Sequence, residues 1–192
     1  MRRFKRAVTA DGVRYRSTFD AHEVTMLTNL LGSLIEMLDD RQSSAPRDEL
    51  AELTGMRVGN SQRPDDETML RLLPDFYRPP AGETEAESAE DVNSALRALH
   101  EPEIIDAKRQ AAQRLVATLP PDGGRLELTE PDAQAWAAAV NDLRLALGVM
   151  LEVGPRGPKR VPSNHPLAGH RDVYNWLSFL QESLVGALMS GR

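Results

Sequence analysis

Residues 126–153 read LELTEPDAQAWAAAVNDLRLALGVMLEV, and this stretch decides the fold. It begins as a short strand pattern, and Thr129, followed by a proline and an aspartate, is a helix start signal. The stripe that follows at helical spacing consists of Trp136, Val140, Leu143, Leu147 and Met150. Leu145 and Val149 lie on the opposite side of the same helix. Because a helix that is apolar on both sides is usually buried, we expect residues 129–152 to form the central helix.

The N-terminal residues predict a β-hairpin. Residues 4–8 and 13–19 are β-prone runs on either side of Asp11-Gly12, which is a strong hairpin turn signal. Residues 125–128 can add a third short strand beside this hairpin.

The remaining helices are predicted from caps and from apolar periodicity. We expect them over residues 20–40, 46–54, 65–73, 88–119 and 170–189. Asp20 with Glu23 three residues later forms a capping-box pattern at the start of the first of these helices. Pro102 is expected to divide the long helical region in which it lies. Residues 79–91 and 154–169 are predicted to be mobile surface loops.

These elements predict a mainly α fold of the α+β class. It has five to six helices around a central buried helix, with a small antiparallel β-hairpin or three-stranded sheet. Residues 1–192 are expected to form a single domain, because a chain of this length can bury a full hydrophobic core.

Composition restricts where the protein works and by which chemistry. No apolar run approaches the roughly 18 residues that a membrane span requires, and the N-terminus lacks the apolar stretch of a signal peptide. We therefore expect a cytoplasmic protein without membrane contact. The chain contains no cysteine, which excludes disulfides, zinc–thiolate sites, iron–sulfur clusters and thiol redox sensing within it.

The formal net charge of −6 is unevenly distributed. Residues 1–16 carry a net charge of +5, so the remainder carries −11. The basic residues of this end, which we call the basic hairpin, are Arg2, Arg3, Lys5, Arg6, Arg14 and Arg16. The acidic remainder argues against a general nucleic-acid surface, whereas the basic hairpin can attract an acidic partner or a phosphate backbone. The alternative is a solvated hairpin without a specific partner.

The sequence contains no signature of catalysis or of cofactor binding. Residues 154–157 are rich in glycine but lack the strand, the helix and the Lys-Ser/Thr of a phosphate-binding loop. His165 and His170 are five residues apart across a Pro/Gly loop and match no common metal spacing. Adjacent carboxylate residues occur at predicted helix ends and in a polar loop, where helix capping and solubility account for their presence. We expect no catalytic residue, no metal site and no cofactor.

One segment is similar to part of a DNA-binding motif. Residues 48–55 look like the first helix and turn of a helix-turn-helix. The following residues, 56–64, are too short and too broken for a recognition helix, so the expectation is against direct DNA binding.

Charged residues inside apolar faces predict a structural polar network. Lys108 falls near the middle of an apolar stripe, and Asp142 and Arg144 lie within the central helix. Buried charges are costly unless they are paired, so we expect these three residues to hold helices together, with Lys108 and Asp142 as a hypothetical pair. The alternatives are a snorkelling lysine, and a ligand or partner contact at Arg144.

Four segments also carry a resemblance to a known family. They are FKR and GVRYRSTFDAHEVTMLTNLLGSLIEML (residues 4–6 and 12–38), DDETMLRLLPDFYR (65–78), the quoted stretch 126–153, and VYNWLSFLQESLVGAL (173–188). They resemble an actinobacterial domain-of-unknown-function family whose members are oxidative-stress transcriptional regulators of the AosR type. The similarity covers most of the chain except residues 79–95 and 154–170.

The resemblance implies a non-enzymatic regulatory protein that acts by contact with the transcription machinery, notably a stress-type sigma factor. In the family the redox signal is a nearby cysteine pair, which this chain lacks, so an oxidant signal is expected to arrive through a partner. The basic hairpin is then the expected partner-binding surface, and a homodimer is left open. The competing hypothesis is a small-molecule-binding or enzymatic helical domain with a pocket near Trp136, Arg144 and Trp176.

Overall fold

The computed structural model describes residues 2–45, 58–79, 86–155, 157–159, 162 and 164–190. Along the chain the elements are β1 (Lys5–Thr9), β2 (Gly12–Phe19), α1 (Ala21–Ser43), α3 (Glu67–Leu72), α4 (Ala86–Thr118), β3 (Gly124–Leu128), α5 (Glu130–Met150) and α6 (Ala168–Met189). Five helices and one antiparallel sheet among these residues confirm the predicted mainly α, α+β fold. An all-α description would be too narrow, because the third predicted strand is present and pairs with the hairpin.

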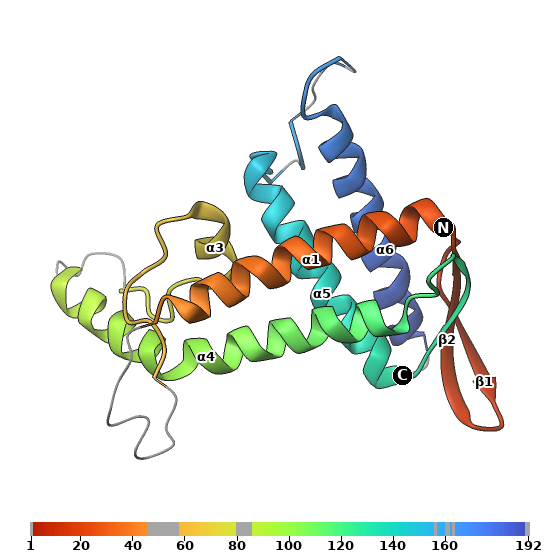
Figure 1. Cartoon of the computed structure of the whole chain (residues 1–192), viewed down its shortest axis with the longest axis horizontal. Helices are drawn as coiled ribbons and strands as arrows, with labels where there is room; N and C mark the ends of the chain where they lie inside the picture. The colour runs from red at the N-terminus through yellow and green to blue at the C-terminus, as the bar shows by residue number, and fades with distance from the viewer. Residues whose placement is uncertain are drawn as a thin grey trace.

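Helix α5 is the centre of the fold, as its sequence predicts. Helices α1 and α4 lie side by side and run in opposite directions, α5 and α6 cross behind them, and the sheet covers one end (Figure 1). Helix α5 contacts each of the other four described helices and strands β2 and β3 as well. Both chain ends lie at the sheet end of the molecule (Figure 1).

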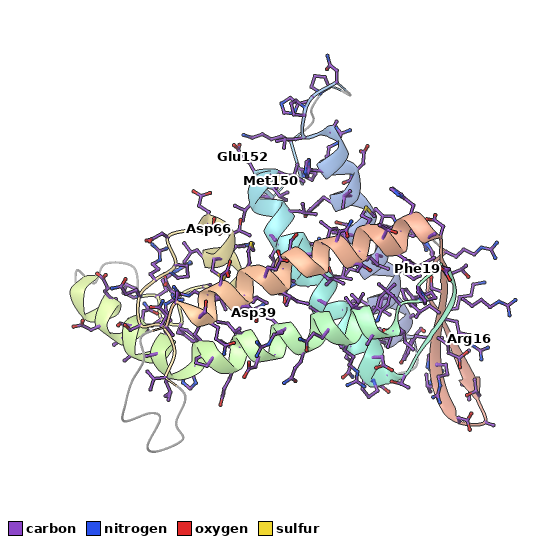
Figure 2. The ribbon with its side chains drawn as sticks, viewed as in Figure 1. Arg16, Phe19, Asp39, Asp66, Met150 and Glu152 are labelled. Atoms are coloured by element: carbon purple, nitrogen blue, oxygen red, sulfur yellow. The ribbon has the colours of Figure 1, made fainter. Side chains whose placement is uncertain are left out.

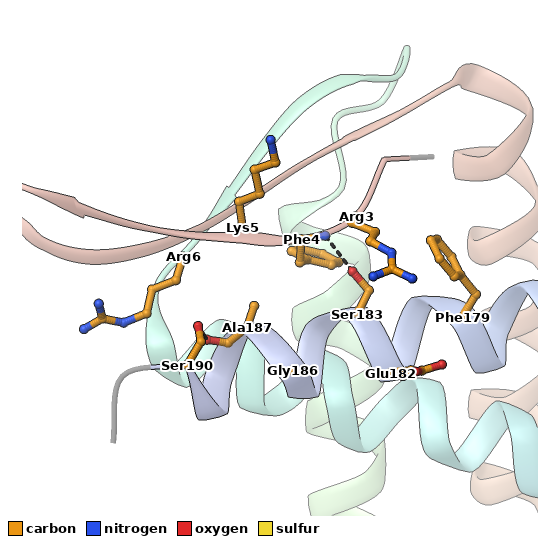
Figure 3. A pocket seen from close by; sticks show the side chains of 10 residues that line it. All are labelled: Arg3, Phe4, Lys5, Arg6, Phe179, Glu182, Ser183, Gly186, Ala187 and Ser190. Carbon is orange, nitrogen blue, oxygen red and sulfur yellow. Dashed lines mark hydrogen bonds between the residues drawn. The ribbon is translucent and has the colours of Figure 1, made fainter.

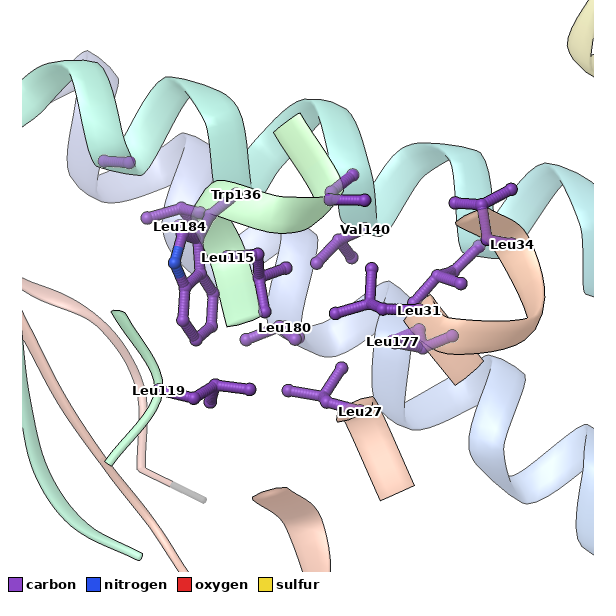
Figure 4. Packing of buried hydrophobic residues seen from close by; sticks show 14 of the residues in the cluster. Leu27, Leu31, Leu34, Leu115, Leu119, Trp136, Val140, Leu177, Leu180 and Leu184 are labelled. Atoms are coloured by element: carbon purple, nitrogen blue, oxygen red, sulfur yellow. The ribbon is translucent and has the colours of Figure 1, made fainter. Parts of the chain in front are cut away.

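The buried face of α5 organises one hydrophobic core. Trp136 and Val140 are fully buried among leucines of α1, α4 and α6 (Figure 4). Burying each such leucine contributes roughly 1.5–3 kcal/mol to stability. Met150 is the exception to the predicted stripe, because it is 50% exposed at the end of α5 (Figure 2). The helix ends there, and Leu151 takes the buried position instead.

The predicted helix starts are confirmed by their hydrogen bonds. The Asp20 carboxylate accepts from the Glu23 backbone N–H, and the Glu23 carboxylate accepts from the Asp20 N–H, both at 2.9 Å. Thr129 forms the same reciprocal arrangement with Asp132 at the start of α5. Asp66 caps α3, and its carboxylate accepts from the Met69 N–H. Each cap satisfies donors that a first helical turn leaves unpaired.

The prediction that Pro102 divides the long helix is wrong, because α4 continues through it. Proline has no N–H, so the carbonyl of Ala98, four residues earlier, loses its helical donor. The Gly59 N–H donates to that carbonyl at 2.7 Å. A neighbouring loop thus replaces the missing helical bond, and the helix is kept.

Two predicted loops are shorter than expected. Residues 86–91 belong to α4 and not to a mobile loop, and α6 begins at Ala168, inside the predicted loop 154–169. The predicted helix 46–54 and most of the helix-turn-helix-like segment lie outside the described residues.

Gly59 provides a test of the Pro102 arrangement. A Cβ at this position would lie 2.7 Å and 2.8 Å from ring carbons of Pro102 and 3.3 Å from the Ala98 oxygen. We expect Gly59→Ala to lower the free energy of unfolding by about 1–3 kcal/mol, because the clash separates the loop from α4. Chemical denaturation measures this change.

The matched control is Gly32→Ala in α1, where nothing lies within 4 Å of the added Cβ. That variant is expected to be neutral or to gain up to about 1 kcal/mol from helix propensity. Equal stability of the two variants would contradict the role assigned to Gly59.

Candidate functional site

The hairpin at the sheet end carries the basic residues. Its register pairs Lys5 with Arg16 and Val8 with Val13 across a two-residue turn, Ala10-Asp11. Gly12, the first residue of β2, has φ +101°. Alternate residues of a strand point to opposite faces, so the apolar members of β2 face the helices and the basic members face solvent. The sequence alternation thereby separates a buried face from a charged face.

Aromatic rings fix this hairpin to the central helix. The Phe4 ring lies 6.0 Å and the Phe19 ring 5.5 Å from the ring of Trp136, measured between centroids. All three side chains are buried. The hairpin is therefore held rigidly against α5, and its charged face points away from the core.

Hydrogen bonds that involve the main chain hold the first residues in place. The Phe4 N–H donates to the Ser183 hydroxyl of α6 at 2.7 Å. The Arg2 N–H donates to the Thr18 carbonyl at 3.1 Å, and the Ser17 hydroxyl donates to the Arg2 carbonyl. The N-terminal basic residues consequently start from a fixed backbone.

The outer face of the sheet holds three of the six predicted residues. Lys5, Arg14 and Arg16 share this face by register, and Figure 2 shows Arg16 at the edge of the molecule. Arg16 Nε lies 2.6 Å and Arg14 Nε 3.7 Å from carboxylate oxygens of Glu127 on β3, which neutralises part of their charge. Arg125 of β3 is paired with Thr18 and joins the same face, although the sequence analysis did not single it out.

Arg3 and Arg6 lie beside a different feature, an open groove between β1 and α6 (Figure 3). Its volume is 660 Å³. The residues that line this β1–α6 groove are Arg3, Phe4, Lys5, Arg6, Phe179, Glu182, Ser183, Gly186, Ala187 and Ser190. The Arg3 guanidinium carbon stands 5.4 Å from the centre of the Phe179 ring, a cation–π distance. Arg2 is exposed nearby.

Only two of the three residues of the predicted polar network contact each other. Lys108 Nζ donates to Asp142 Oδ1 at 2.7 Å, so the two residues that the sequence pairs do lie in contact between α4 and α5. Arg144 is not part of this pair. Its guanidinium donates to Ser178 and Gln181 of α6 and lies 5.6 Å from the centre of the Tyr174 ring.

Burial dominates the electrostatics of Asp142. Loss of solvent raises the pKa of this carboxyl above its ordinary value, and the Lys108 ammonium lowers it by less than burial raises it. The ionised Asp142 carboxylate therefore lowers the stability of the folded state.

A second set of charges is centred on two buried side chains, Arg97 and Glu101, and was not predicted from the sequence; we call it the buried ion-pair cluster. It comprises Arg41 of α1, Asp75 after α3, and Arg97 and Glu101 of α4. The side chains of Arg97 and Glu101 are 1% and 2% exposed. Glu101 accepts from Arg41 Nε at 2.6 Å and from Arg97 Nη1 at 3.0 Å, and Arg97 Nη2 donates to Asp75 at 2.8 Å.

This cluster also holds loop backbone. Arg97 donates to the Leu73 carbonyl at 3.1 Å, and Arg41 donates to the Gln62 carbonyl. The two loops beside α3 are thus fixed to α4 and α1 by charged hydrogen bonds. The sequence does contain a signal for it, because counting back by four from buried Ile105 reaches Glu101 and then Arg97.

The three residues of the competing pocket hypothesis bond to different partners. Trp136 is buried and donates to Thr118, and Trp176 donates to the Glu23 carboxylate at 3.1 Å. Arg144 bonds to α6 instead, and none of the three lines the β1–α6 groove.

Among the described residues, no group of three or more His, Cys, Asp or Glu side chains could hold a metal ion. None of the described helices is long and apolar enough to cross a membrane.

Glu101 tests the buried ion-pair cluster. We expect Glu101→Gln to destabilise the protein by about 3–5 kcal/mol, because two buried guanidinium groups lose their shared carboxylate. Thermal and urea unfolding measure the loss. The control is Glu103→Gln, an exposed neighbour on the same helix, which should change stability by less than about 0.5 kcal/mol. A loss at position 101 as small as that of the control would show that the cluster is not stabilising.

Asp142 tests the balance between burial and pairing by its pH dependence. Since its pKa is raised in the folded protein, the folded state keeps a proton that the unfolded state has released. From about pH 4 upward, where an unfolded aspartate ionises, the unfolding free energy of the wild type should therefore fall relative to Asp142→Asn. Urea unfolding of both proteins between acidic and neutral pH checks this. If the unfolding free energy of the wild type instead rises with pH relative to that of the variant, the Lys108 charge outweighs burial.

Comparison with known proteins places the chain in a family. The model of DUF2017, a domain of unknown function, matches residues 1–188. Proteins named oxidative stress regulator AosR in Mycobacterium tuberculosis and Mycobacterium bovis are 61% identical over 196 residues, which covers 100% of this chain and 90% of each relative. An AosR relative in Mycobacterium leprae is 55% identical over 197 residues, with 99% and 89% covered. No solved structure matches. The chain therefore belongs to the DUF2017 family.

Proposed function

We propose that this protein is a non-enzymatic regulator of the oxidative stress response that acts by contact with the transcription machinery. The observation that carries the proposal is similarity along the whole chain to proteins named oxidative stress regulators. A stress-type sigma factor is the first partner to test. A cytoplasmic location follows from that role.

The basic hairpin is the surface that we assign to this contact. Its charge contrasts with an acidic remainder, and it stands at one end of the molecule on a backbone fixed by Trp136 and Ser183. Opposite charges on a partner would steer association and make it sensitive to salt. Lys5 and Arg6 are the most suitable members for a test, since they are exposed and form no ion pair among those that the structure gives.

The oxidant signal in this proposal enters through the partner. The chain has no cysteine, so it offers no thiol to oxidise. The described methionines with the most exposed side chains, Met150 and Met189, are 50% and 66% exposed and lie at helix ends.

The contact surface is tested by the double substitution Lys5→Glu and Arg6→Glu. Affinity for a purified stress-type sigma factor, measured at low salt, should fall by about tenfold or more, since two attractive charges become repulsive. The control reverses two exposed residues, Arg71 in the last turn of α3 and Arg78 after that helix, and so changes the net charge equally. Loss of oxidant-induced transcription in a deletion strain, restored by the control and not by the hairpin variant, would link binding to regulation. Equal effects of the two variants would contradict the assignment to the hairpin.

The source of the signal is tested by oxidising one component at a time. Peroxide treatment of this protein alone should leave its affinity for the partner unchanged, because the chain has no thiol and its described methionines lie outside the basic hairpin. Treatment of the partner alone should change the affinity. Calorimetry with each component oxidised in turn gives the answer, and a response that needs only this protein oxidised would rule out the proposed route.

A further inference from the structure

We propose that the free edge of β1 and the β1–α6 groove bind an acidic, extended segment of the partner protein, which adds to the sheet as a further strand. This inference rests on the proposed function, because it specifies how the partner of that function is held.

Strand β1 offers free main-chain groups. Among the described residues the sheet order is β1-β2-β3, so one side of β1 has no neighbouring strand. In an antiparallel pair, alternate residues direct both N–H and C=O toward the partner strand. Thr9 and Gly12 close a two-residue turn, and residues that close such a turn form a hydrogen-bonded pair, so Ala7 and Lys5 face β2 in the same way. Arg6 and Val8 alternate with them and therefore direct their N–H and C=O away from β2, as the Phe4 N–H does when it reaches Ser183. These two residues provide four main-chain groups for an added strand.

The groove provides room beneath that strand. Along α6 its floor is made of small residues, Ser183, Gly186, Ala187 and Ser190, which lie under the edge of β1 (Figure 3). Its volume of 660 Å³ is within the range of roughly 300–1,000 Å³ that ligand sites occupy. Side chains of an added strand that point inward would lie on this floor. Val8, 74% exposed on the same edge, offers an apolar contact beside it.

Charge selects the occupant. Arg3, Lys5 and Arg6 line the groove against a single carboxylate, Glu182, so an acidic segment is favoured. The same charges oppose pairing of the β1 edges of two copies, because like charges would face each other. DNA fits less well, since Glu127 already neutralises part of the charge of the outer face of the sheet.

The direct test uses the full-length protein and a blocked, fluorescent peptide of sequence Glu-Val-Glu-Val-Glu, with Lys-Val-Lys-Val-Lys as its control. Hydrogen exchange measured by nuclear magnetic resonance follows single amides. The amides of Arg6 and Val8 should exchange rapidly in the free protein and slow by about tenfold or more when the acidic peptide binds. The Ala7 amide, which faces β2, should be protected throughout.

A pair of variants separates strand addition from simple charge attraction. Val8→Pro removes a main-chain donor that the sheet does not use, and proline is tolerated on such an edge. It should weaken acidic-peptide binding by about tenfold, whereas Val8→Thr, which keeps the N–H, should change it by less than about twofold. If Val8→Pro fails to fold, the exchange pattern of the wild type still decides the matter.

Several results would overturn the proposal. The first three concern the acidic peptide: it does not bind at all, it binds no better than the lysine peptide, or it binds while the amides of Arg6 and Val8 stay unprotected. Two further contradicting results are amide protection that rises with protein concentration in the absence of peptide, and displacement of the labelled peptide by a DNA duplex at a lower concentration than by unlabelled peptide. Such results would leave the proposed function standing if the deletion strain still loses its oxidant response. Normal regulation in the deletion strain would instead remove the proposed function, whether or not the peptide binds.

Discussion

Trp136 lies completely buried where the hairpin, α4 and α5 meet, and the positions of the other elements depend on that contact. Its ring packs on Phe4 and Phe19, and its N–H is satisfied by Thr118. A buried aromatic side chain of this size needs both apolar neighbours and a hydrogen-bond acceptor. Because α5 also contacts every other described helix, fixing the hairpin on Trp136 fixes it relative to the whole core. The basic hairpin is therefore a rigid surface and not a loose arm.

The two ends of the molecule are joined to the helical core by different interactions. The sheet end is joined to the helices by aromatic packing, whereas the end near α3 is joined by the buried ion-pair cluster and by the Gly59 bond to Ala98. Aromatic packing tolerates changes in surface charge, while a buried ion pair is strongly weakened when one partner is lost. This division leaves the charged residues at the sheet end available for contact with other molecules.

The sequence predicted the elements whose signals are local and missed those that depend on distant residues. The two caps and the hairpin turn are each decided within a few residues, and the structure contains all three. The turn residues are Ala10 and Asp11, and Gly12 begins β2. The break at Pro102 was predicted from a local rule, but a glycine 43 positions earlier in the chain supplies the missing donor. A break at Pro102 would also separate Glu101 and Arg97 from the buried stripe that contains Ile105, so the same local rule does not predict the buried ion-pair cluster.

The proposed partner-binding site also combines a local sequence signal with a feature that depends on distant residues. Clustered charge near the N-terminus was visible in the sequence, but the groove was not, since it forms only when β1 and α6 meet. Hydrogen–deuterium exchange of this protein, alone and bound to RNA polymerase that carries a stress-type sigma factor, tests the central claim most directly. The account predicts new protection in residues 2–9 and 179–190 and none in residues 65–78. Protection confined to residues 65–78, with the hairpin and α6 unchanged, would contradict it.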